Sequence, residues 1–362
     1  MRKIKVLFVN GGLMDYGGIS SFIINYLSYF DFEKFEVDIA VHGNQIGSRD
    51  KEIERFDCHI YHLPIKSQSY HKWKGEVLKL LRLKKYDIIH ANADAGNGPI
   101  LKIAKKANVP IRISHSHNTQ VLTNNKVRIM LNNIQKKQIL KYATNFFACS
   151  QMAGEWLYKN NKFEIIYNAI DYEKYKFNYE IRIEKRNELN LSDEEIVVGH
   201  VGRFDYQKNH MFILELAKRL KKIKFLLIGD GHLRDKIEKN IKKNHLNNII
   251  LLGEKNNVEN YLNAMDFFIL PSLFEGLGIS VIEAQVNGLY CVVSNNVPKE
   301  CKITKNICFC DINDINLWIN EIEILKNKTR KMIDTSNLDD KYNLKAQSKR
   351  LQDKYISLIN NI

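Results

Sequence analysis

The sequence has little of what marks a membrane-spanning, secreted or fibrous protein. Its apolar runs all fall short of the ~18–20 residues that cross a bilayer, and the opening ten residues are too short an apolar stretch for a secretion signal. With 18 glycines and 5 prolines among 362 residues, the composition is neither disordered nor collagen-like. We therefore expect a globular protein that stays in the cytoplasm.

The six cysteines form no pattern typical of a metal site or a disulfide framework. No Cys-x-x-Cys occurs, and no cysteine is spaced from a histidine as in zinc-binding motifs. Cys308 and Cys310 flank Phe309 in a predicted strand, where buried free thiols are common. The cysteines therefore predict neither a structural metal nor disulfides.

The composition does contain an excess of positive charge. Lys and Arg number 55 against 41 Asp and Glu, a net charge of +14. Such proteins bind nucleic acid, anionic lipid or phosphorylated small molecules. The excess is concentrated in residues 66–141, which hold 16 basic and 3 acidic residues, a net +13. Elsewhere a simple preference for lysine is the alternative explanation.

Length and pattern predict two α/β domains. A chain of 362 residues exceeds the ~250–300 at which a single core stops growing. Short apolar runs alternate with amphipathic stretches, which is typical of βα units around a parallel sheet. The alternation restarts after the polar segment 171–195, which we interpret as the linker and the entry to the second domain. We predict doubly wound, Rossmann-like domains over 1–175, completed by a crossover helix at 341–362, and over 176–340.

The individual elements follow from the same pattern. Strands are predicted at 4–9, 35–41, 58–63, 86–91, 111–114 and 145–149, and then at 196–201, 225–228, 249–252, 267–270, 290–294 and 307–310. Helices are predicted at about 18–30, 71–84, 98–107, 127–142, 151–159, 209–221, 233–244, 257–264, 279–287, 314–326 and 340–361.

Two glycine pairs follow the opening strand, directly before an amphipathic helix. Glycine lets backbone N–H groups approach a ligand, and a helix N-terminus favours anionic groups. The Gly-x-Gly-x-x-Gly spacing of nicotinamide dehydrogenases is absent. An ordinary turn is the alternative interpretation, but Gly17 and Gly18, at the helix start, are candidate ligand contacts.

The strand at 111–114 runs into His115 and His117. Ligands bind beyond the carboxyl ends of strands in open parallel sheets, so polar residues here are expected to face a crevice. Two imidazoles at i and i+2 suggest a metal, but no third histidine or carboxylate lies nearby in the sequence. We interpret them as hydrogen-bonding or acid/base groups; solvent-facing loop histidines are the alternative.

Two cations follow the strand at 196–201. Arg203 and Lys208 lie five residues apart in a strand-to-helix turn, where a planar guanidinium and a point charge can converge on one diphosphate. The helix that begins near Asn209 adds its positive end. A solvated surface pair is the alternative, but the position after Gly202 at a strand end favours a phosphate site.

Two carboxylates flank a predicted helix N-terminus near Gly278. Glu275 lies in a glycine-containing loop after the strand at 267–270, and Glu283 lies within the following helix. Carboxylates in this arrangement can hold sugar and ribose hydroxyls while the backbone N–H groups of 277–279 meet phosphate. The alternatives are that Glu275 only compensates the charge of the helix N-terminus and that Glu283 lies on a solvated helix face.

Taken together, these residues resemble the retaining nucleotide-sugar glycosyltransferases of family 4, which have the GT-B fold. The resemblance covers nearly the whole chain. It is most specific over 196–300, where 202–210 and 282–294 are similar to the subgroup that builds exopolysaccharide or capsule. The Ile-Gly-Asp-Gly segment ending at Gly231 adds to it. The Glu-x7-Glu spacing is a specific signal only together with the Arg/Lys turn and the N-terminal glycine pair.

The resemblance implies a role for each matching residue of the second domain. Arg203 and Lys208 would hold the donor diphosphate and stabilise the charge on the leaving nucleotide. Glu275 would contact the donor sugar and Glu283 the ribose. Further donor contacts would come from Gly231, Gly276, Leu277 and Gly278.

In the first domain, His117 resembles the crevice histidine of the family. His115 is the alternative, because the alignment of that loop is ambiguous by two positions. Gly17 and Gly18 match the family's glycine pair beside the phosphates and acceptor.

The activity implied is transfer of a sugar, with retention, from a nucleotide diphosphate sugar, a UDP-sugar, to a glycan or polyprenyl-diphosphate-linked acceptor in extracellular or capsular polysaccharide synthesis. Neither a metal nor another cofactor is expected, since no Asp-x-Asp lies in a suitable loop. The two cations and the helix N-terminus can stabilise the negative charge of the diphosphate in place of a metal ion. By the same resemblance, residues 66–141 would lie in the half that faces the acceptor, so we expect part of their charge to contact anionic lipid at the inner face of the cell membrane.

Two other functions are kept as alternatives. A GT-B-fold nucleotide-sugar epimerase would use the same donor but no acceptor. A non-enzymatic nucleic-acid-binding protein would explain the charge, but the basic residues include no recognition motif and no interleaved aromatic platform. We therefore expect no nucleic acid among the partners.

Overall fold

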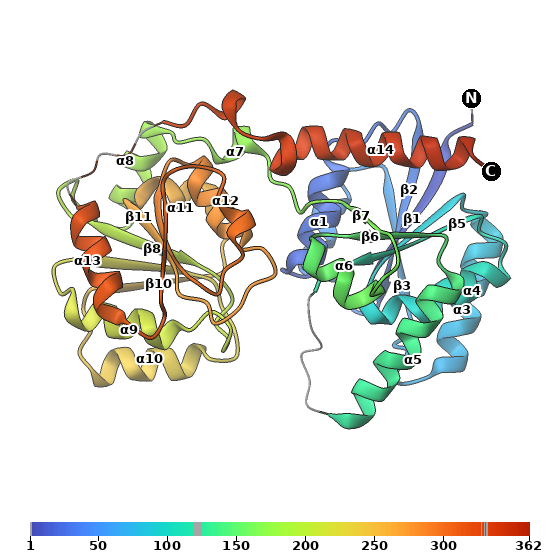
Figure 1. The fold of residues 1–362 in the computed structure, drawn as a ribbon, viewed down its shortest axis with the longest axis horizontal. Coiled ribbons are helices and arrows are strands. Elements are labelled where there is room, and N and C mark those ends of the chain that lie inside the picture. Colours follow the sequence, from blue (N-terminus) through green and yellow to red (C-terminus); the bar gives the residue numbers. More distant parts are fainter. Residues whose placement is uncertain (1, 119–124, 327, 329, 331) are drawn as a thin grey trace. The chain divides into compact units, whose positions relative to one another are not determined.

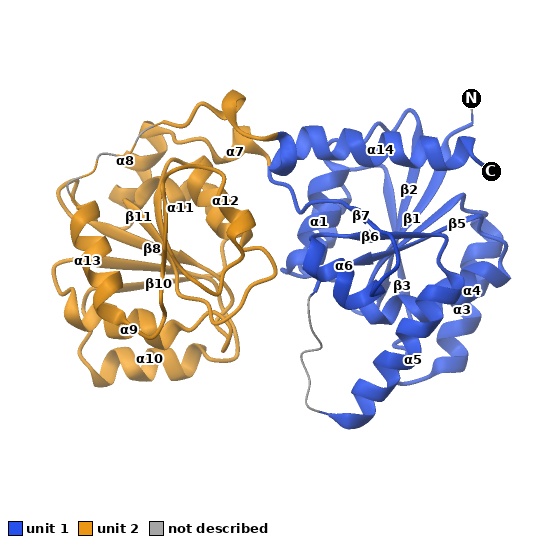
Figure 2. Ribbon diagram, in the orientation of Figure 1, with its two compact units in different colours: residues 1–170, 340–362 blue, residues 171–339 orange. Residues whose placement is uncertain are grey.

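The protein was analysed as a computed structural model that describes residues 2–118, 125–326, 328, 330 and 332–362. It divides into two compact units (Figure 2). Unit 1 comprises residues 1–170 and 340–362, and unit 2 comprises 171–339. Each unit is an α/β layer structure around a parallel sheet, which confirms the predicted fold class. The divisions fall after 170 and 339, where the sequence predicts 175 and 340.

Unit 1 has a seven-stranded sheet with the order β3-β2-β1-β4-β5-β6-β7. All neighbouring strands pair in parallel. The strands are β1 (Ile4–Asn10), β2 (Phe35–His42), β3 (Cys58–Leu63), β4 (Ile88–Asn92), β5 (Ile111–Ser116), β6 (Asn145–Ala148) and β7 (Glu164–Ile165). The helices are α1 (Gly18–Leu27), α2 (Asp50–Ile53), α3 (Tyr70–Lys84), α4 (Asn97–Lys106), α5 (Lys126–Tyr142), α6 (Gln151–Tyr158) and α14 (Leu344–Asn360), with a 3₁₀ turn at Asp94–Gly96.

The central strand β1 shows why the predicted strands are apolar throughout. Successive side chains of a strand point to opposite faces. Val6 and Phe8 enter the core cluster on one face of the sheet, whereas Leu7 and Val9 enter the cluster on the other. Helices cover both faces (Figure 1), so neither set of side chains meets water.

The C-terminal helix α14 belongs to unit 1, although the chain reaches it only after completing unit 2 (Figure 2). Leu344, Leu351 and Tyr355 bury one face of α14 in the core cluster that contains Phe8. These positions repeat with the helical period, so one stripe faces the sheet. The prediction that the last helix returns to the first domain is confirmed.

Unit 2 has a six-stranded sheet with the order β10-β9-β8-β11-β12-β13, and its neighbours are again parallel. The strands are β8 (Val197–Val201), β9 (Lys224–Ile228), β10 (Ile249–Gly253), β11 (Phe267–Leu270), β12 (Tyr290–Ser294) and β13 (Ile307–Cys310). The helices are α7 (Tyr172–Tyr175), α8 (Tyr179–Glu188), α9 (His210–Arg219), α10 (Arg234–Lys243), α11 (Val258–Ala264), α12 (Ile279–Val286) and α13 (Ile315–Leu325). Among the described residues, no helix is both long and apolar enough to span a membrane.

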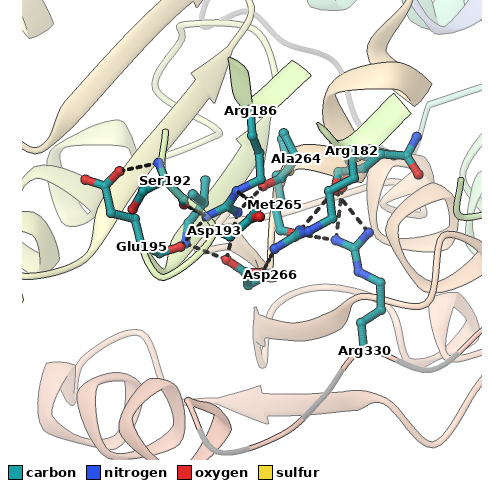
Figure 3. A network of polar contacts seen from close by, with 12 residues as sticks. Arg182, Arg186, Ser192, Asp193, Glu195, Ala264, Met265, Asp266 and Arg330 are labelled. Atoms are coloured by element: carbon teal, nitrogen blue, oxygen red, sulfur yellow. Dashed lines mark hydrogen bonds and ion pairs between the residues drawn. The ribbon is translucent and has the colours of Figure 1, made fainter. Parts of the chain in front are cut away.

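The second unit begins at Asp171, within the segment 171–195 that the sequence marks as the entry to the second domain. The segment is not an irregular linker, however, because it contains α7 and α8. Helix α8 is polar on the face that it buries. Arg186 is 1% exposed and donates to the carbonyl oxygen of Ala264 at 2.9 Å, while Arg182 pairs with Asp266 at 2.7 Å. Figure 3 shows both guanidinium groups, with that of Arg330, turned toward the end of α11 and the start of β11. A helix whose buried face is polar cannot be recognised from the spacing of apolar residues.

We predict that Arg186→Met destabilises unit 2. Arg186 also donates to the carbonyl oxygens of Ser192 and Glu195 and lies 3.4 Å from Asp266. Methionine fills similar space but leaves these acceptors without their donor, so the free energy of unfolding should fall by about 3 kcal/mol. Urea unfolding followed by the fluorescence of Trp318, with Trp73 and Trp156 replaced by Phe, measures the change in unit 2.

Arg219→Met is the matched control. Arg219 pairs with Glu215 on α9, and both side chains are more than two-fifths exposed, so its loss should cost at most ~1 kcal/mol. Equal losses for the two variants would contradict the structural role of Arg186.

Candidate active site

Lys208 and Glu275 meet at the carboxyl ends of two paired strands of unit 2. The turn after β8 carries Lys208, and the loop after β11 carries Glu275. The Lys208 Nζ lies 2.6 Å from the Glu275 Oε1, and the two side chains are 16% and 7% exposed. Solvent screens such a pair less than a surface pair. The structure therefore joins two residues that the sequence placed in separate motifs.

Two further donors fix the orientation of the Glu275 carboxylate. The amide of Gln207 donates to Oε2 at 3.1 Å, and the hydroxyl of Ser272 donates to Oε1 at 2.6 Å. Ser272 is fully buried. Because both carboxylate oxygens are held by donors from two loops, the group has a defined direction before any substrate binds.

The loop continues from Glu275 through Gly276 and the buried Leu277 into the N-terminus of α12. Gly278, the N-cap residue, has φ +83°, a conformation that favours glycine. It has no side chain to cap the helix, so the first N–H groups of α12 are available to an anion. Residues 276–278 thus lead from the carboxylate directly to the positive end of a helix.

Arg203 lies in the turn after β8 and is exposed, beside the fully buried Phe204. This turn packs against the loop after β9 very closely. A Cβ added to Gly231 would lie 2.5 Å from the carbonyl oxygen of Phe204, and one added to Gly229 would lie 2.1 Å from that of Gly202. The structure therefore gives Gly231 a packing role that positions the Arg203 turn; its donor contact stays a prediction.

Glu283 lies on α12 and accepts a hydrogen bond from the Tyr175 hydroxyl at 2.9 Å. Burial disfavours the ionised carboxyl and raises its pKa to about 7, while the hydrogen bond from Tyr175 and the positive charge of Lys174 oppose this shift. The residue retains partial exposure. Glu283 can therefore change its charge close to neutral pH.

The histidines of unit 1 lie in very different surroundings. His115 is fully buried in β5, and its Nδ1 lies 3.0 Å from the Nε2 of His90 on β4. The other ring nitrogen of His90 is bonded to the hydroxyl of Tyr355 on α14. Burial holds the pKa of His90 and His115 well below the usual range. This part of the cluster is a core hydrogen-bond network.

His117 follows β5 and is partly exposed, while its ring stacks on that of His115 with centroids 4.1 Å apart. Its Nε2 lies 2.9 Å from the Oδ1 of Asn92, and its backbone N–H donates to Asp94 at 2.6 Å. Burial lowers the pKa of the ring to about 4, against the opposing effect of Asp94. Of the two candidate histidines, the structure leaves only His117 at the surface.

Asn92 determines which nitrogen of His117 carries the proton. The Nδ2 of Asn92 donates to the carbonyl oxygen of His90 at 3.0 Å, so its Oδ1 faces His117. An acceptor at this place requires N–H at Nε2, which leaves the lone pair at Nδ1. His117 is therefore a neutral ring with an acceptor nitrogen.

Gly17 is the N-cap residue of α1, and Gly18 is its first residue. Both are exposed, and a Cβ added to Gly18 would meet no atom within 4 Å. Packing therefore does not require glycine at 18, and the N-terminus of α1 is open to solvent.

Sequence reasoning missed the residues that hold these groups in place, namely His90, Asn92, Gln207, Ser272 and Tyr175. The first two leave a signal, since they are polar residues near the end of an otherwise apolar strand. Gln207 and Ser272 lie in loops where polar residues are ordinary. Among the described residues, no group of three or more His, Cys, Asp or Glu side chains is placed to hold a metal.

Comparison with known proteins places the chain in a family. The model described as "Glycosyltransferase Family 4" matches residues 16–174, and that described as "Glycosyl transferases group 1" matches 181–347. EpsF of Bacillus subtilis, which is assigned as a glycosyltransferase, is 31% identical over 310 residues, covering 82% of this chain and 80% of EpsF. The chain belongs to the GT-B glycosyltransferases.

Other relatives of this GT-B glycosyltransferase have names that refer to bacterial glycans. An Escherichia coli UDP-Gal:alpha-D-GlcNAc-diphosphoundecaprenol alpha-1,3-galactosyltransferase is 28% identical over 78% of either chain. The capsular polysaccharide biosynthesis glycosyltransferase CapH of Staphylococcus aureus is 28% identical over 75% of this chain and 76% of its own. Anabaena HepE, solved with UDP-glucose, has the same fold, with a TM-score of 0.78 at 17% identity, covering 98% of this chain and 100% of HepE.

We predict that Asn92→Asp raises the pKa of His117 by roughly 1–3 units, because a carboxylate replaces the amide oxygen beside Nε2. Long-range ¹H–¹⁵N correlation spectra of the histidine rings, recorded as a function of pH, measure both the pKa and the tautomer. His117→Gln and His115→Gln assign the two resonances.

In the wild type the spectra should show His117 protonated at Nε2 and neutral until pH falls toward 4. A proton at Nδ1, or a His117 pKa that Asn92→Asp leaves unchanged, would contradict the role of Asn92.

Proposed function

We propose that the protein transfers a sugar from a UDP-sugar, with retention and without a metal, to a glycan or polyprenyl-diphosphate-linked acceptor in extracellular or capsular polysaccharide synthesis. The observation that carries the proposal is the Lys208–Glu275 pair, 2.6 Å long, at the strand ends of unit 2 beside the N-terminus of α12. It offers a cation for phosphate and a carboxylate for hydroxyls in one place.

The donor diphosphate binds to Lys208, Arg203 and the first N–H groups of α12. The ammonium group shares its charge between Glu275 and a phosphate oxygen, and Arg203 contributes a planar fork from the neighbouring turn. As the glycosidic bond breaks, negative charge grows on the leaving UDP. Fixed positive groups at this point stabilise the transition state more than the ground state. These groups can do the work of a divalent cation.

The donor sugar and ribose bind to the two carboxylates. Glu275, fixed by Gln207 and Ser272, accepts hydrogen bonds from sugar hydroxyls and sets the orientation of the ring. Glu283 accepts from the ribose hydroxyls in its ionised form. Since its pKa is raised to about 7, ribose binding favours loss of a proton from Glu283.

In unit 1, the Nδ1 of His117 is a buried acceptor without a hydrogen-bond partner among the described residues, a partner that a sugar or acceptor hydroxyl would supply on reaching it. The N-terminus of α1 at Gly17 and Gly18 is open to an anionic group. The names of the E. coli galactosyltransferase and of CapH support a lipid-linked acceptor and a capsular product. A lipid-linked acceptor places the protein at the inner face of the cell membrane.

We predict that Lys208→Ala lowers the turnover of UDP-sugar about 100-fold, since one charged transition-state contact is lost. Lys243→Ala, which removes an exposed lysine of α10, is the matched control and should keep full turnover. Product formation from a panel of UDP-sugars is followed by mass spectrometry, with and without EDTA.

The wild type should transfer sugar equally well in EDTA. Full turnover by Lys208→Ala would overturn the phosphate site, and activity lost in EDTA and restored by Mg²⁺ would overturn metal independence. Conversion of the donor to another UDP-sugar without any acceptor would identify an epimerase instead.

A further inference from the structure

His200 is a buried polar residue inside the sheet of unit 2. It lies in β8 between Gly199 and Val201, and its side chain is fully buried. The other residues of this strand are valines and a glycine. Burying an imidazole ring costs free energy unless its nitrogens find partners. A histidine at this position therefore needs a bonding role within the sheet.

One nitrogen of the His200 ring ties β8 to its neighbour β11. The backbone pairing of these two strands ends at Gly199 and Phe268, although β8 pairs with β9 along its whole length. Where the pairing with β11 ends, the Nδ1 of His200 lies 3.0 Å from the carbonyl oxygen of Ile269. The side chain thus continues the link between the two strands beyond the last backbone pair.

The other nitrogen of the ring faces the turn that carries Lys208. A carbonyl oxygen only accepts, so Nδ1 carries the proton. Burial holds the pKa of His200 well below its usual range, which leaves Nε2 with its lone pair. A Cβ added to Gly202 would lie 3.1 Å from this Nε2 and 3.0 Å from the Cδ and Cε of Lys208. The ring and the lysine stem therefore both lie against the backbone of Gly202.

His210 completes a cluster of three rings beside the Lys208 turn. It is the first residue of α9, two residues after Lys208, and is 1% exposed. Its ring is perpendicular to that of His200, with centroids 4.9 Å apart, and its centroid lies 4.3 Å from that of Phe204. Its nitrogens have no hydrogen-bond partner among the described residues, so His210 contributes by ring packing. Because Phe204 precedes Lys208 and His210 follows it, the cluster holds the turn at both ends.

The Lys208 turn and the loop after β11 are also linked nearer the solvent. The backbone N–H of Leu273 donates to the carbonyl oxygen of Gln207 at 2.8 Å, and the side chain of Asn209 donates to that of Pro271 at 3.3 Å. Gln207, Asn209 and Leu273 are partly exposed, so water can compete for these bonds. The bond from His200 has no such competitor and lies where the two segments leave the sheet.

We propose that His200 is a positioning residue for the Lys208–Glu275 pair. Its bond to β11 sets the separation of the two strand ends, and the cluster with Phe204 and His210 transmits this separation to the turn that holds Lys208. Groups that bind a ligand in one geometry need such support from the residues behind them. That the ammonium group is thereby placed to meet a donor diphosphate rests on the proposed function, but the positioning of the pair does not.

The ammonium signal of Lys208 tests the proposal without any ligand. In ¹H–¹⁵N spectra of lysine side chains, an ammonium group held by a carboxylate exchanges slowly with water and gives a resolved signal, which Lys208→Met assigns. His200→Phe keeps a ring but removes the donor, so the Lys208 signal should broaden or move to the position of exposed lysines. His200→Asn places an amide N–H near the former Nδ1 and should restore the signal.

Asn248→Leu is the matched control. Asn248 is a buried residue of unit 2 that donates to the carbonyl oxygens of Ala217, Leu220 and Ile223. It directly precedes β10, at the amino ends of the parallel strands, whereas Lys208 lies beyond their carboxyl ends. The control should lower the urea midpoint of unit 2, as His200→Phe should, but leave the Lys208 signal unchanged.

Calorimetry with UDP connects the position of Lys208 with donor binding. His200→Phe should weaken UDP binding about 10-fold, as for loss of one hydrogen bond to a charged group. His200→Asn and Asn248→Leu should bind UDP within about twofold of the wild type. A purely structural role of His200 would instead lower stability and leave the affinity of the folded protein unchanged.

His210 provides a second pair of variants in case His200→Phe does not fold. His210→Ala removes the ring that joins the cluster to the turn and should also alter the Lys208 signal. His210→Phe keeps a ring and should preserve the signal.

A Lys208 signal that His200→Phe or His210→Ala leaves unchanged, or that Asn248→Leu alters equally, would overturn the proposal. So would a wild-type Lys208 signal that already resembles those of exposed lysines. Absence of UDP binding in the wild type would contradict the proposed function and leave the ammonium signals as the test of His200.

Discussion

The ion pair between Lys208 and Glu275 is the interaction on which the proposed chemistry depends. A lysine and a glutamate with 16 and 7% exposed side chains lose much of their hydration, a cost that mutual attraction and further hydrogen bonds must offset. Gln207 and Ser272 supply those bonds. The pair is therefore held in one geometry, and a diphosphate that enters meets an ammonium group already in place.

The fold places this pair by ordinary rules for parallel sheets. Strands β8 and β11 are neighbours although they are far apart in the chain, so the loops after them open at the same edge of the sheet. The turn at 202–204 packs closely against residues 229–231, and only glycine fits at 229 and 231. This packing fixes the position of the Arg203 turn. Helix α12 then begins directly after the Glu275 loop. Lys208 and the N-terminus of α12 thus bring positive charge to the same edge of the sheet.

Much of this could be predicted from sequence, for a physical reason. Strands buried on both faces must be apolar throughout, which made β1 or β11 visible as runs, and Gly278 marks a helix start by its conformational demand. The stripe of Leu344, Leu351 and Tyr355 identified α14. In the strands and in α14, the apolar pattern itself carries the structural information, and Gly278 adds a conformational signal.

The features that sequence did not reveal depend on polar partners distant in the chain. Helix α8 is held by Arg182 and Arg186 against Asp266, so its buried face looks like a solvated one. His90 is hydrogen-bonded to Tyr355, which lies 265 residues away in the chain. Because this network is not visible in the sequence, the sequence could not distinguish His117 from His115. The spacing of the apolar residues in α5 predicts a helix, but it does not reveal that several of these side chains stay exposed.

The dissociation constant of UDP, measured by calorimetry for the wild type, Lys208→Met and Glu275→Gln, tests the central claim most directly. If Lys208 holds the diphosphate and Glu275 the sugar, Lys208→Met should weaken UDP binding ~10–100-fold, as for loss of a hydrogen bond to a charged group. Glu275→Gln should leave UDP binding unchanged or tighter, because the ammonium group loses its competing partner. Equal weakening by both variants, or none by Lys208→Met, would contradict the account.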